Sequence, residues 1–150
     1  MRMFLFRCLT ISFTVITLLV LSGVVTAAPL KVLIVDGQNN HKNWAQTTQM
    51  MKQYLEDSAL FAVSVKTHAA RGEDPTFMPA FADYDVVVSN FGHGAPPWPT
   101  ATQTALEDFI SAGGGLVVIH AADNAFPDWP AYNEMIGLGG WGGRTEKNGP

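Results

Sequence analysis

Short apolar runs recur along the chain after residue 30, and each is a candidate strand. Residues 31–35, 85–89 and 115–119 are almost unbroken runs of Val, Ile and Leu. Runs of this kind are typical of parallel strands that are buried on both faces. Residues 61–66 alternate between apolar and polar side chains, which also predicts a strand. The first run ends at Asp36 and Gly37, where we expect the chain to turn.

The best-marked helix lies between the last two runs. Thr100 and Gln103 have the spacing of a capping box, in which each side chain satisfies a free backbone N–H group. Gly113 stands where a helix commonly ends in a left-handed residue. The side chains expected to form the buried stripe of this helix are Ala101, Ala105, Leu106, Phe109 and Ile110.

Two further helices complete the pattern, over residues 44–57 and near residues 130–136. In the first, the apolar positions Trp44, Met51, Tyr54 and Leu55 are close to helical spacing. Strands that alternate with helices predict an α/β fold with right-handed crossovers. We expect a flavodoxin-like three-layer α/β/α domain with a parallel sheet of order 2-1-3-4. Because four strands make a thin sheet of this type, we also expect the chain to be C-terminally truncated.

Residues 1–27 have the features of a secretory signal peptide. Arg2 and Arg7 precede an uncharged apolar stretch, and small or neutral residues occupy the expected cleavage positions Val25 and Ala27. The alternative is an uncleaved anchor over residues 9–28, in which case the protein would meet the membrane only through this segment. We expect cleavage, a periplasmic or extracellular location, and a mature α/β domain over residues 28–150.

Composition narrows the classes of function. The chain is 47% hydrophobic and 15% charged, with a net charge of −4, which argues against disorder and against a general nucleic-acid binder. The one cysteine, Cys8, belongs to the signal segment. The mature domain therefore has no disulfide and no thiol nucleophile. The sequence leaves the oligomeric state open.

Three histidines follow neighbouring strands of the predicted sheet. His41 follows the first strand, His93 follows the third and His120 ends the fourth. Ligands of open α/β sheets bind at the carboxyl ends of the strands, so we expect these side chains to converge. Imidazoles act as general acids or bases, or as metal ligands. With a carboxylate from Asp36, Asp123 or Asp128 they could hold a zinc-like ion; the alternative is three unrelated loop histidines.

Aromatic and amide side chains occur in the same connections and suggest a polyol ligand. A sugar offers apolar C–H faces to aromatic rings and hydroxyl groups to polar side chains. The alternative for the tryptophans is packing beneath their helices. The residues predicted to bind substrate are His41, Asn90, Trp98, Asp128 and Trp129.

Several segments together resemble the ThuA-like, or trehalose-utilisation, family, which has a class I glutamine amidotransferase-like fold. They are residues 31–37 with His41, residues 84–90, the GGGLVVIHAA segment over 113–122 and the DWPAYNEMIG segment over 128–137. The resemblance implies a flavodoxin-like domain and a link to disaccharide or keto-sugar catabolism. Amidotransferases of this fold carry their catalytic cysteine where this chain has His120. Without a thiol no thioester can form, so glutaminase activity is excluded.

Two functions follow from these observations. In the first, an exported enzyme processes a small sugar, with His120 and His93 as acid/base or ligand groups and Asp123 and His41 supporting them. In the second, the chain is a non-catalytic carbohydrate-binding or interaction module. A third reading is that the 150 residues are an incomplete gene product, in which the loss of an outer strand would leave an exposed parallel edge and poor solubility.

Overall fold

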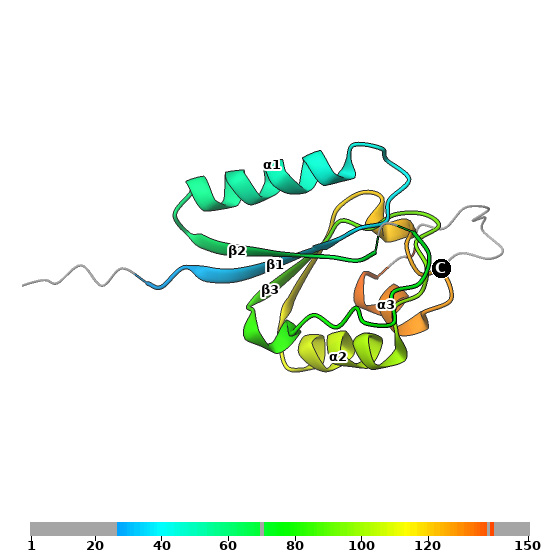
Figure 1. The fold of residues 1–150 in the computed structure, drawn as a ribbon. Helices are drawn as coiled ribbons and strands as arrows, with labels where there is room; N and C mark the ends of the chain where they lie inside the picture. Colours follow the sequence, from blue (N-terminus) through cyan, green and yellow to red (C-terminus); the bar gives the residue numbers. More distant parts are fainter. Residues whose placement is uncertain (1–26, 70, 138, 140–150) are drawn as a thin grey trace, which may run out of the picture.

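The strands form one parallel sheet, as the sequence predicts. The computed structural model describes residues 27–69, 71–137 and 139. The strands are β1 (Leu30–Asp36), β2 (Phe61–Thr67), β3 (Val86–Ser89) and β4 (Gly115–Val118). They pair in parallel in the order β2-β1-β3-β4, which confirms the predicted order 2-1-3-4 (Figure 1). The signal segment predicted over residues 1–27 lies outside the described residues, apart from Ala27.

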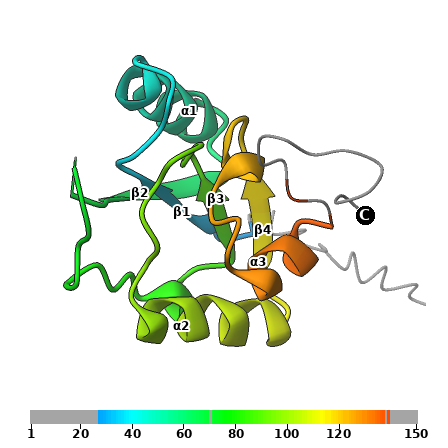
Figure 2. The ribbon, with the colours of Figure 1, turned by 90° about the vertical axis from the view of Figure 1, so that its right-hand side faces the viewer.

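Helices cover both faces of the sheet. Helix α1 (Trp44–Asp57) lies on one face, and α2 (Thr100–Ser111) and α3 (Pro130–Met135) lie on the other (Figures 1 and 2). The 3-10 helices η1 (Phe81–Asp83) and η2 (Ala122–Asn124) join these elements. Within the described ranges, no helix is both long and apolar enough to span a membrane. The arrangement confirms the predicted three-layer α/β fold.

Alternate residues of β1 serve the two halves of the core. Val32 and Ile34 pack in the cluster beneath α1, whereas Leu33 and Val35 pack in the larger cluster beneath α2. All four side chains are at most 2% exposed. A central parallel strand is covered on both faces, which is why its sequence is a continuous apolar run. Complete burial of each such side chain contributes about 1.5–3 kcal/mol to the free energy of unfolding.

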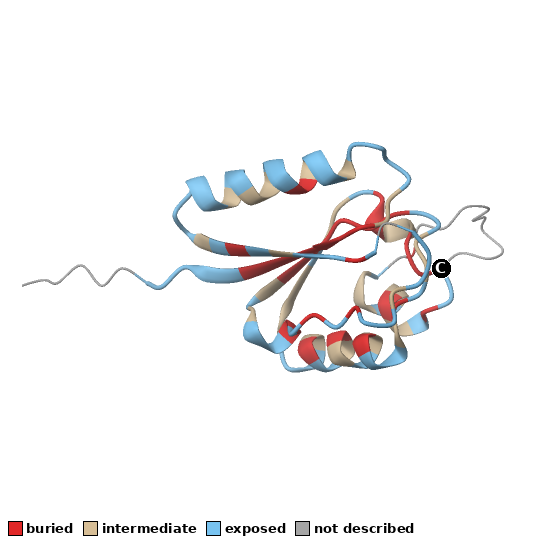
Figure 3. Ribbon diagram, in the orientation of Figure 1, coloured by how far each residue is buried: buried red, intermediate tan, exposed pale blue. Residues whose placement is uncertain are grey.

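Helix α1 has the predicted bounds, but one of its predicted core positions is wrong. Met51 and Leu55 pack against the sheet, whereas Tyr54 is 66% exposed. Thr48 is fully buried instead, one turn before Met51. The outward face of α1 is exposed along its length (Figure 3).

The capping box predicted at the start of α2 is absent. Thr100 is the first helical residue, Pro99 precedes it as the N-cap, and no side chain caps the helix. The Gln103 side chain does not reach back to an N-cap N–H group; its Nε2 donates to the Trp98 carbonyl oxygen at 2.9 Å. Because a capping side chain must come from a residue outside the helix, Thr100 cannot act as one here.

The predicted end of α2 is confirmed. Gly113 has a φ of +97°, its N–H group donates to the Ile110 carbonyl, and the N–H group of Gly114 donates to the Phe109 carbonyl. This pair of hydrogen bonds is the Schellman arrangement. In the predicted stripe, Leu106 and Phe109 are buried and Ala101 is exposed.

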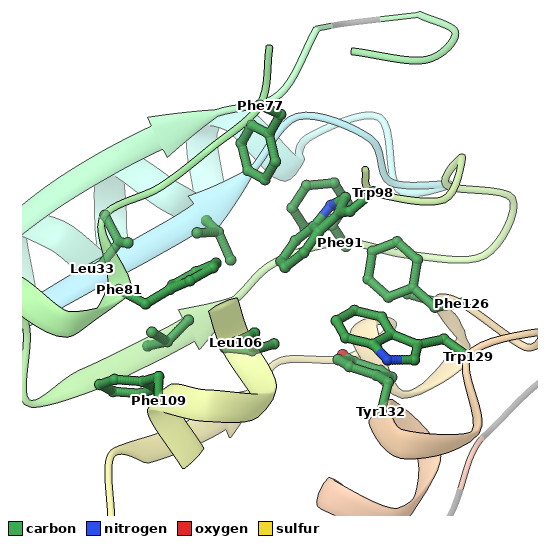
Figure 4. Close-up of a cluster of buried hydrophobic side chains, with 13 residues drawn as sticks. Leu33, Phe77, Phe81, Phe91, Trp98, Leu106, Phe109, Phe126, Trp129 and Tyr132 are labelled. Carbon is green, nitrogen blue, oxygen red and sulfur yellow. The ribbon is translucent and has the colours of Figure 1, made fainter. Parts of the chain in front are cut away.

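An aromatic cluster fills the space between the sheet, α2 and α3 (Figure 4). Trp98 is at its centre, with ring centroids of five other aromatic side chains 5.1–6.1 Å away. Aromatic pairs at such distances contribute about 0.5–1.5 kcal/mol beyond their burial. The neighbours of Trp98 are Phe77, Phe81, Phe91, Phe126 and Trp129. This cluster anchors the loops that follow β3 and β4.

Candidate functional site

The connections that follow β1, β3 and β4 meet at the carboxyl edge of the sheet, which faces the viewer in Figure 2. Here the structure brings together two of the three predicted histidines. The ring centroids of His41 and His120 are 5.3 Å apart, with the ring planes inclined by 52°. His120 Nδ1 lies 3.6 Å from Asp123 Oδ1. That distance is too long for a hydrogen bond but suits an ion pair once His120 is protonated.

The edge is open to water. The side chain of His120 is 74% exposed and that of Asp123 is 40% exposed. An ion pair with this exposure is screened, and its contribution to stability is small. His120 and Asp123 are therefore already accessible to a ligand, and no conformational change is needed to expose them for proton exchange.

His93 is held on the same edge but apart from the other two histidines. Its backbone N–H group donates to Asn40 Oδ1 at 3.0 Å, and its exposed side chain lines a separate cleft. Among residues 27–69, 71–137 and 139, ring contacts join His41 to His120 but neither of them to His93. The same residues include no group of three His, Cys, Asp or Glu side chains placed to hold a metal ion.

Two asparagines hold the β1–α1 and β3–α2 loops together. Asn39 Nδ2 donates to the Phe91 carbonyl oxygen at 2.8 Å, and Asn39 Oδ1 accepts the N–H of His41 at 2.8 Å. Gly92 lies beneath both side chains. A Cβ atom at Gly92 would be 2.5 Å from Asn40 Oδ1 and 2.8 Å from Asn39 Cγ, so any larger residue there would displace the asparagine side chains. The backbones that carry His41 and His93 are thereby held in a defined relation.

Asn90 and Asp36 lie below the surface of the edge. Asn90 is 2% exposed, and its amide nitrogen donates to the Trp44 carbonyl oxygen at 3.0 Å and to Thr48 Oγ1 at 2.9 Å. Almost none of its surface is open to a ligand, and its visible role is to attach α1 to β3. Asp36 is also 2% exposed, with one carboxylate oxygen that has no partner in the described part of the chain.

The predicted substrate-binding tryptophans lie in the core. Trp98 is 3% exposed and central to the aromatic cluster, so it packs in the core, which was the alternative to ligand binding. Trp129 is 6% exposed, and its Nε1 donates to Glu107 Oε1 at 2.7 Å. Trp129 nevertheless reaches the wall of a cleft of about 240 Å³, which Asp128 and His93 also line.

Comparison with known proteins agrees with the resemblance in the sequence. The family model described as "ThuA: Trehalose utilisation" matches residues 31–148. The chain belongs to the ThuA family. Among solved structures, a putative ThuA-like protein from Parabacteroides merdae ATCC 43184 is 41% identical, with a TM-score of 0.74. The alignment covers 81% of this chain and 43% of that one, so this chain spans less than half the length of that relative. No curated protein matches it.

In this ThuA-family chain, a buried tyrosine supports the turn that carries His120 and Asp123. Tyr132 is fully buried, and its hydroxyl donates to the Ala122 carbonyl oxygen at 2.9 Å. Burial raises the pKa of Tyr132 to about 12; the nearby Asp123 carboxylate adds to the rise and the Ser89 hydroxyl opposes it. The hydroxyl therefore stays neutral and keeps donating its hydrogen bond throughout the physiological range.

Several residues that shape the carboxyl edge of the sheet in this ThuA-family chain were not predicted from the sequence. Phe126, with a φ of +54°, lines the cleft, and Glu107 accepts the indole N–H of Trp129, which also lines it. Tyr132 donates a hydrogen bond to Ala122, in the turn that follows His120. No local pattern marks them, because each acts through a partner that is distant in sequence or across a turn. Only the DWPAYNEMIG segment, which contains Tyr132, could have indicated one of them.

Proposed function

We propose that this ThuA-family chain processes a small sugar or keto-sugar, with His120 as the acid/base group. The observation that carries the proposal is the contact between His41 and His120, with Asp123 beside His120. The family's description as trehalose utilisation supports a carbohydrate substrate.

The arrangement suits proton transfer at a hydroxyl or at a carbon next to a keto group. A neutral imidazole accepts a proton near neutral pH. Asp123 Oδ1, 3.6 Å from His120 Nδ1, is placed to form an ion pair with the imidazolium that results. His41, with its ring 5.3 Å away, is placed to donate a hydrogen bond to a neighbouring oxygen of the same ligand. His93 contacts the substrate from the adjacent cleft.

A zinc-like ion fits the side chains at this edge less well. Catalytic zinc is normally held by three protein ligands. The described residues bring together His41 and His120, and no group of three suitable side chains occurs among them. Acid/base chemistry needs only the two imidazoles and Asp123, so it is the mechanism we propose.

Turnover measurements with site variants test this function. The full chain is incubated with glucose-containing disaccharides and their keto derivatives, and products are separated by chromatography. His120→Gln, which retains hydrogen-bonding capacity, should lower kcat by about 10²–10⁴-fold, the usual contribution of a general acid/base group. Gln53→Ala, at an exposed position of α1, is the matched control and should retain full activity. An unchanged kcat in His120→Gln would exclude His120 from catalysis.

The second candidate is carbohydrate binding without turnover. The openness of the edge favours it, since His120 is 74% exposed and nothing in the described part of the chain excludes water from it. Excluding water is what strengthens electrostatic catalysis in most active sites. Saturable sugar binding by the full chain, with substrates unchanged after prolonged incubation, would select this function.

We also propose that the protein is exported and acts in the periplasm or outside the cell. The support is the sequence of residues 1–27, with its basic start, apolar stretch and small residues at the cleavage positions. N-terminal sequencing of protein recovered from the native host should begin at Ala28. A chain that still begins at Met1 in a membrane fraction would indicate the uncleaved anchor.

A further inference from the structure

We infer that the cleft between the β3–α2 loop and the segment before α3 binds one hydroxylated sugar ring, at the same edge of the sheet as the histidine pair. The cleft has a volume of about 240 Å³. Drug-sized ligands occupy pockets of about 300–1,000 Å³, so this cleft is the size for a single ring. Its lining residues are His93, Gly94, Ala95, Pro97, Gln103, Phe126, Pro127, Asp128 and Trp129.

One wall of the cleft is aromatic and rigid. Phe126 and Trp129 are 4% and 6% exposed, so only an edge of each ring reaches the cleft. Their ring centroids are 5.6 Å apart, and both rings contact Trp98 behind them (Figure 4). Glu107 accepts the indole N–H of Trp129 at 2.7 Å, which fixes the ring and leaves no indole donor for a ligand. These ring edges form an apolar wall against which the C–H groups of a pyranose can pack.

The mouth of the cleft carries a mixed set of polar groups. Asp128 accepts hydrogen bonds, and the His93 ring both donates and accepts. Gln103 donates through Nε2 to the Trp98 carbonyl, which orients its amide and leaves the side-chain oxygen as an acceptor. Sugar hydroxyls both donate and accept, so they match this set. A strongly charged anion does not, because Asp128 would repel it.

Both walls of the cleft are linked through the chain to the residues of the histidine pair. On one side, the N–H group of His93 donates to Asn40, the residue before His41. On the other, η2 carries Asp123, and Phe126 follows three residues later. A ring in the cleft therefore lies at the same edge of the sheet as the proposed acid/base group. That the ring belongs to the same substrate rests on the proposed function; that the cleft binds a ring does not.

Nuclear magnetic resonance titration of the full chain tests the inference, with methyl glucoside as the probe. We expect saturable shifts of the His93 ring and Trp129 indole signals in the millimolar range. Asp128→Asn removes the charge and keeps the size, so it should weaken binding about tenfold, as expected for a lost charged hydrogen bond. The matched control is Asp57→Asn, at the exposed end of α1, which should bind as the parent does.

The inference would be overturned if the glucoside gave no saturable shift at His93 and Trp129, or if Asp128→Asn bound it as tightly as the parent does. It would also be overturned if tetramethylammonium, which has no hydroxyl groups, produced the same shifts when used in place of the glucoside. The thermal midpoint of Asp128→Asn should match that of Asp57→Asn, which separates lost binding from lost folding. His120→Gln distinguishes the two proposals. If this variant keeps both its turnover and its cleft binding, the proposed acid/base function fails and the cleft stands.

Discussion

Gly92→Ala should loosen the edge of the sheet that carries the histidines. The added Cβ would lie 2.5 Å from Asn40 Oδ1 and 2.8 Å from Asn39 Cγ, closer than atoms approach in folded proteins. The asparagine side chains must therefore move away. Two hydrogen bonds between the loops depend on them, from Asn39 Nδ2 to the Phe91 carbonyl and from the His93 N–H to Asn40 Oδ1.

The size of the effect follows from these bonds. A typical hydrogen bond contributes about 0.5–1.5 kcal/mol to the free energy of unfolding. The loss of both predicts a decrease of about 1–3 kcal/mol for Gly92→Ala, measured by urea denaturation. The matched control is Gly94→Ala. Gly94 has a φ of +79°, and a Cβ atom there would have no neighbour within 4 Å, so only backbone strain of about 1 kcal/mol is expected.

The histidine signals give a second measure of the same change. In Gly92→Ala the ring resonances of His41 and His93 should shift, because their backbones are held by Asn39 and Asn40. The resonance of His68, buried among Phe77 and Phe91, should shift less. A Gly92→Ala protein as stable as the parent, with unchanged His41 and His93 resonances, would refute the close approach of the two loops.

Two further variants test the supports beneath the site. Asn90→Ala removes the two hydrogen bonds that its amide nitrogen donates to the Trp44 carbonyl and to Thr48 Oγ1, and the one that its amide oxygen accepts from Asn39 at 3.4 Å. The free energy of unfolding should therefore fall by about 2–4 kcal/mol, and a loss below about 1 kcal/mol would contradict the buried link. In the folded protein the pKa of Tyr132 is about 12, above its ordinary value of 10.0. The stability that the neutral Tyr132 hydroxyl contributes is therefore complete below pH 10 and is lost as the pH rises toward 12. Tyr132→Phe should flatten this alkaline limb in denaturation curves measured across that range, and an unchanged limb would contradict the assignment.

Much of the architecture follows from the sequence alone. The apolar runs identify the strands, and local patterns also predict the bounds of α1 and the left-handed Gly113. These features depend on local periodicity and on the conformational freedom of glycine, which neighbouring residues determine. The predicted parallel order 2-1-3-4 is one of the few right-handed arrangements open to such strands, and the structure confirms it.

Tertiary structure decided the surroundings of the individual side chains. Trp98 could have faced a ligand or the core, and five aromatic neighbours from distant segments placed it in the core. Of the three histidines, His41 and His120 meet while His93 lines a cleft, because Asn39 and Asn40 hold the loops in a relation that no local pattern encodes. Packing partners that are far apart in sequence thus determine what the edge of the sheet presents to a ligand.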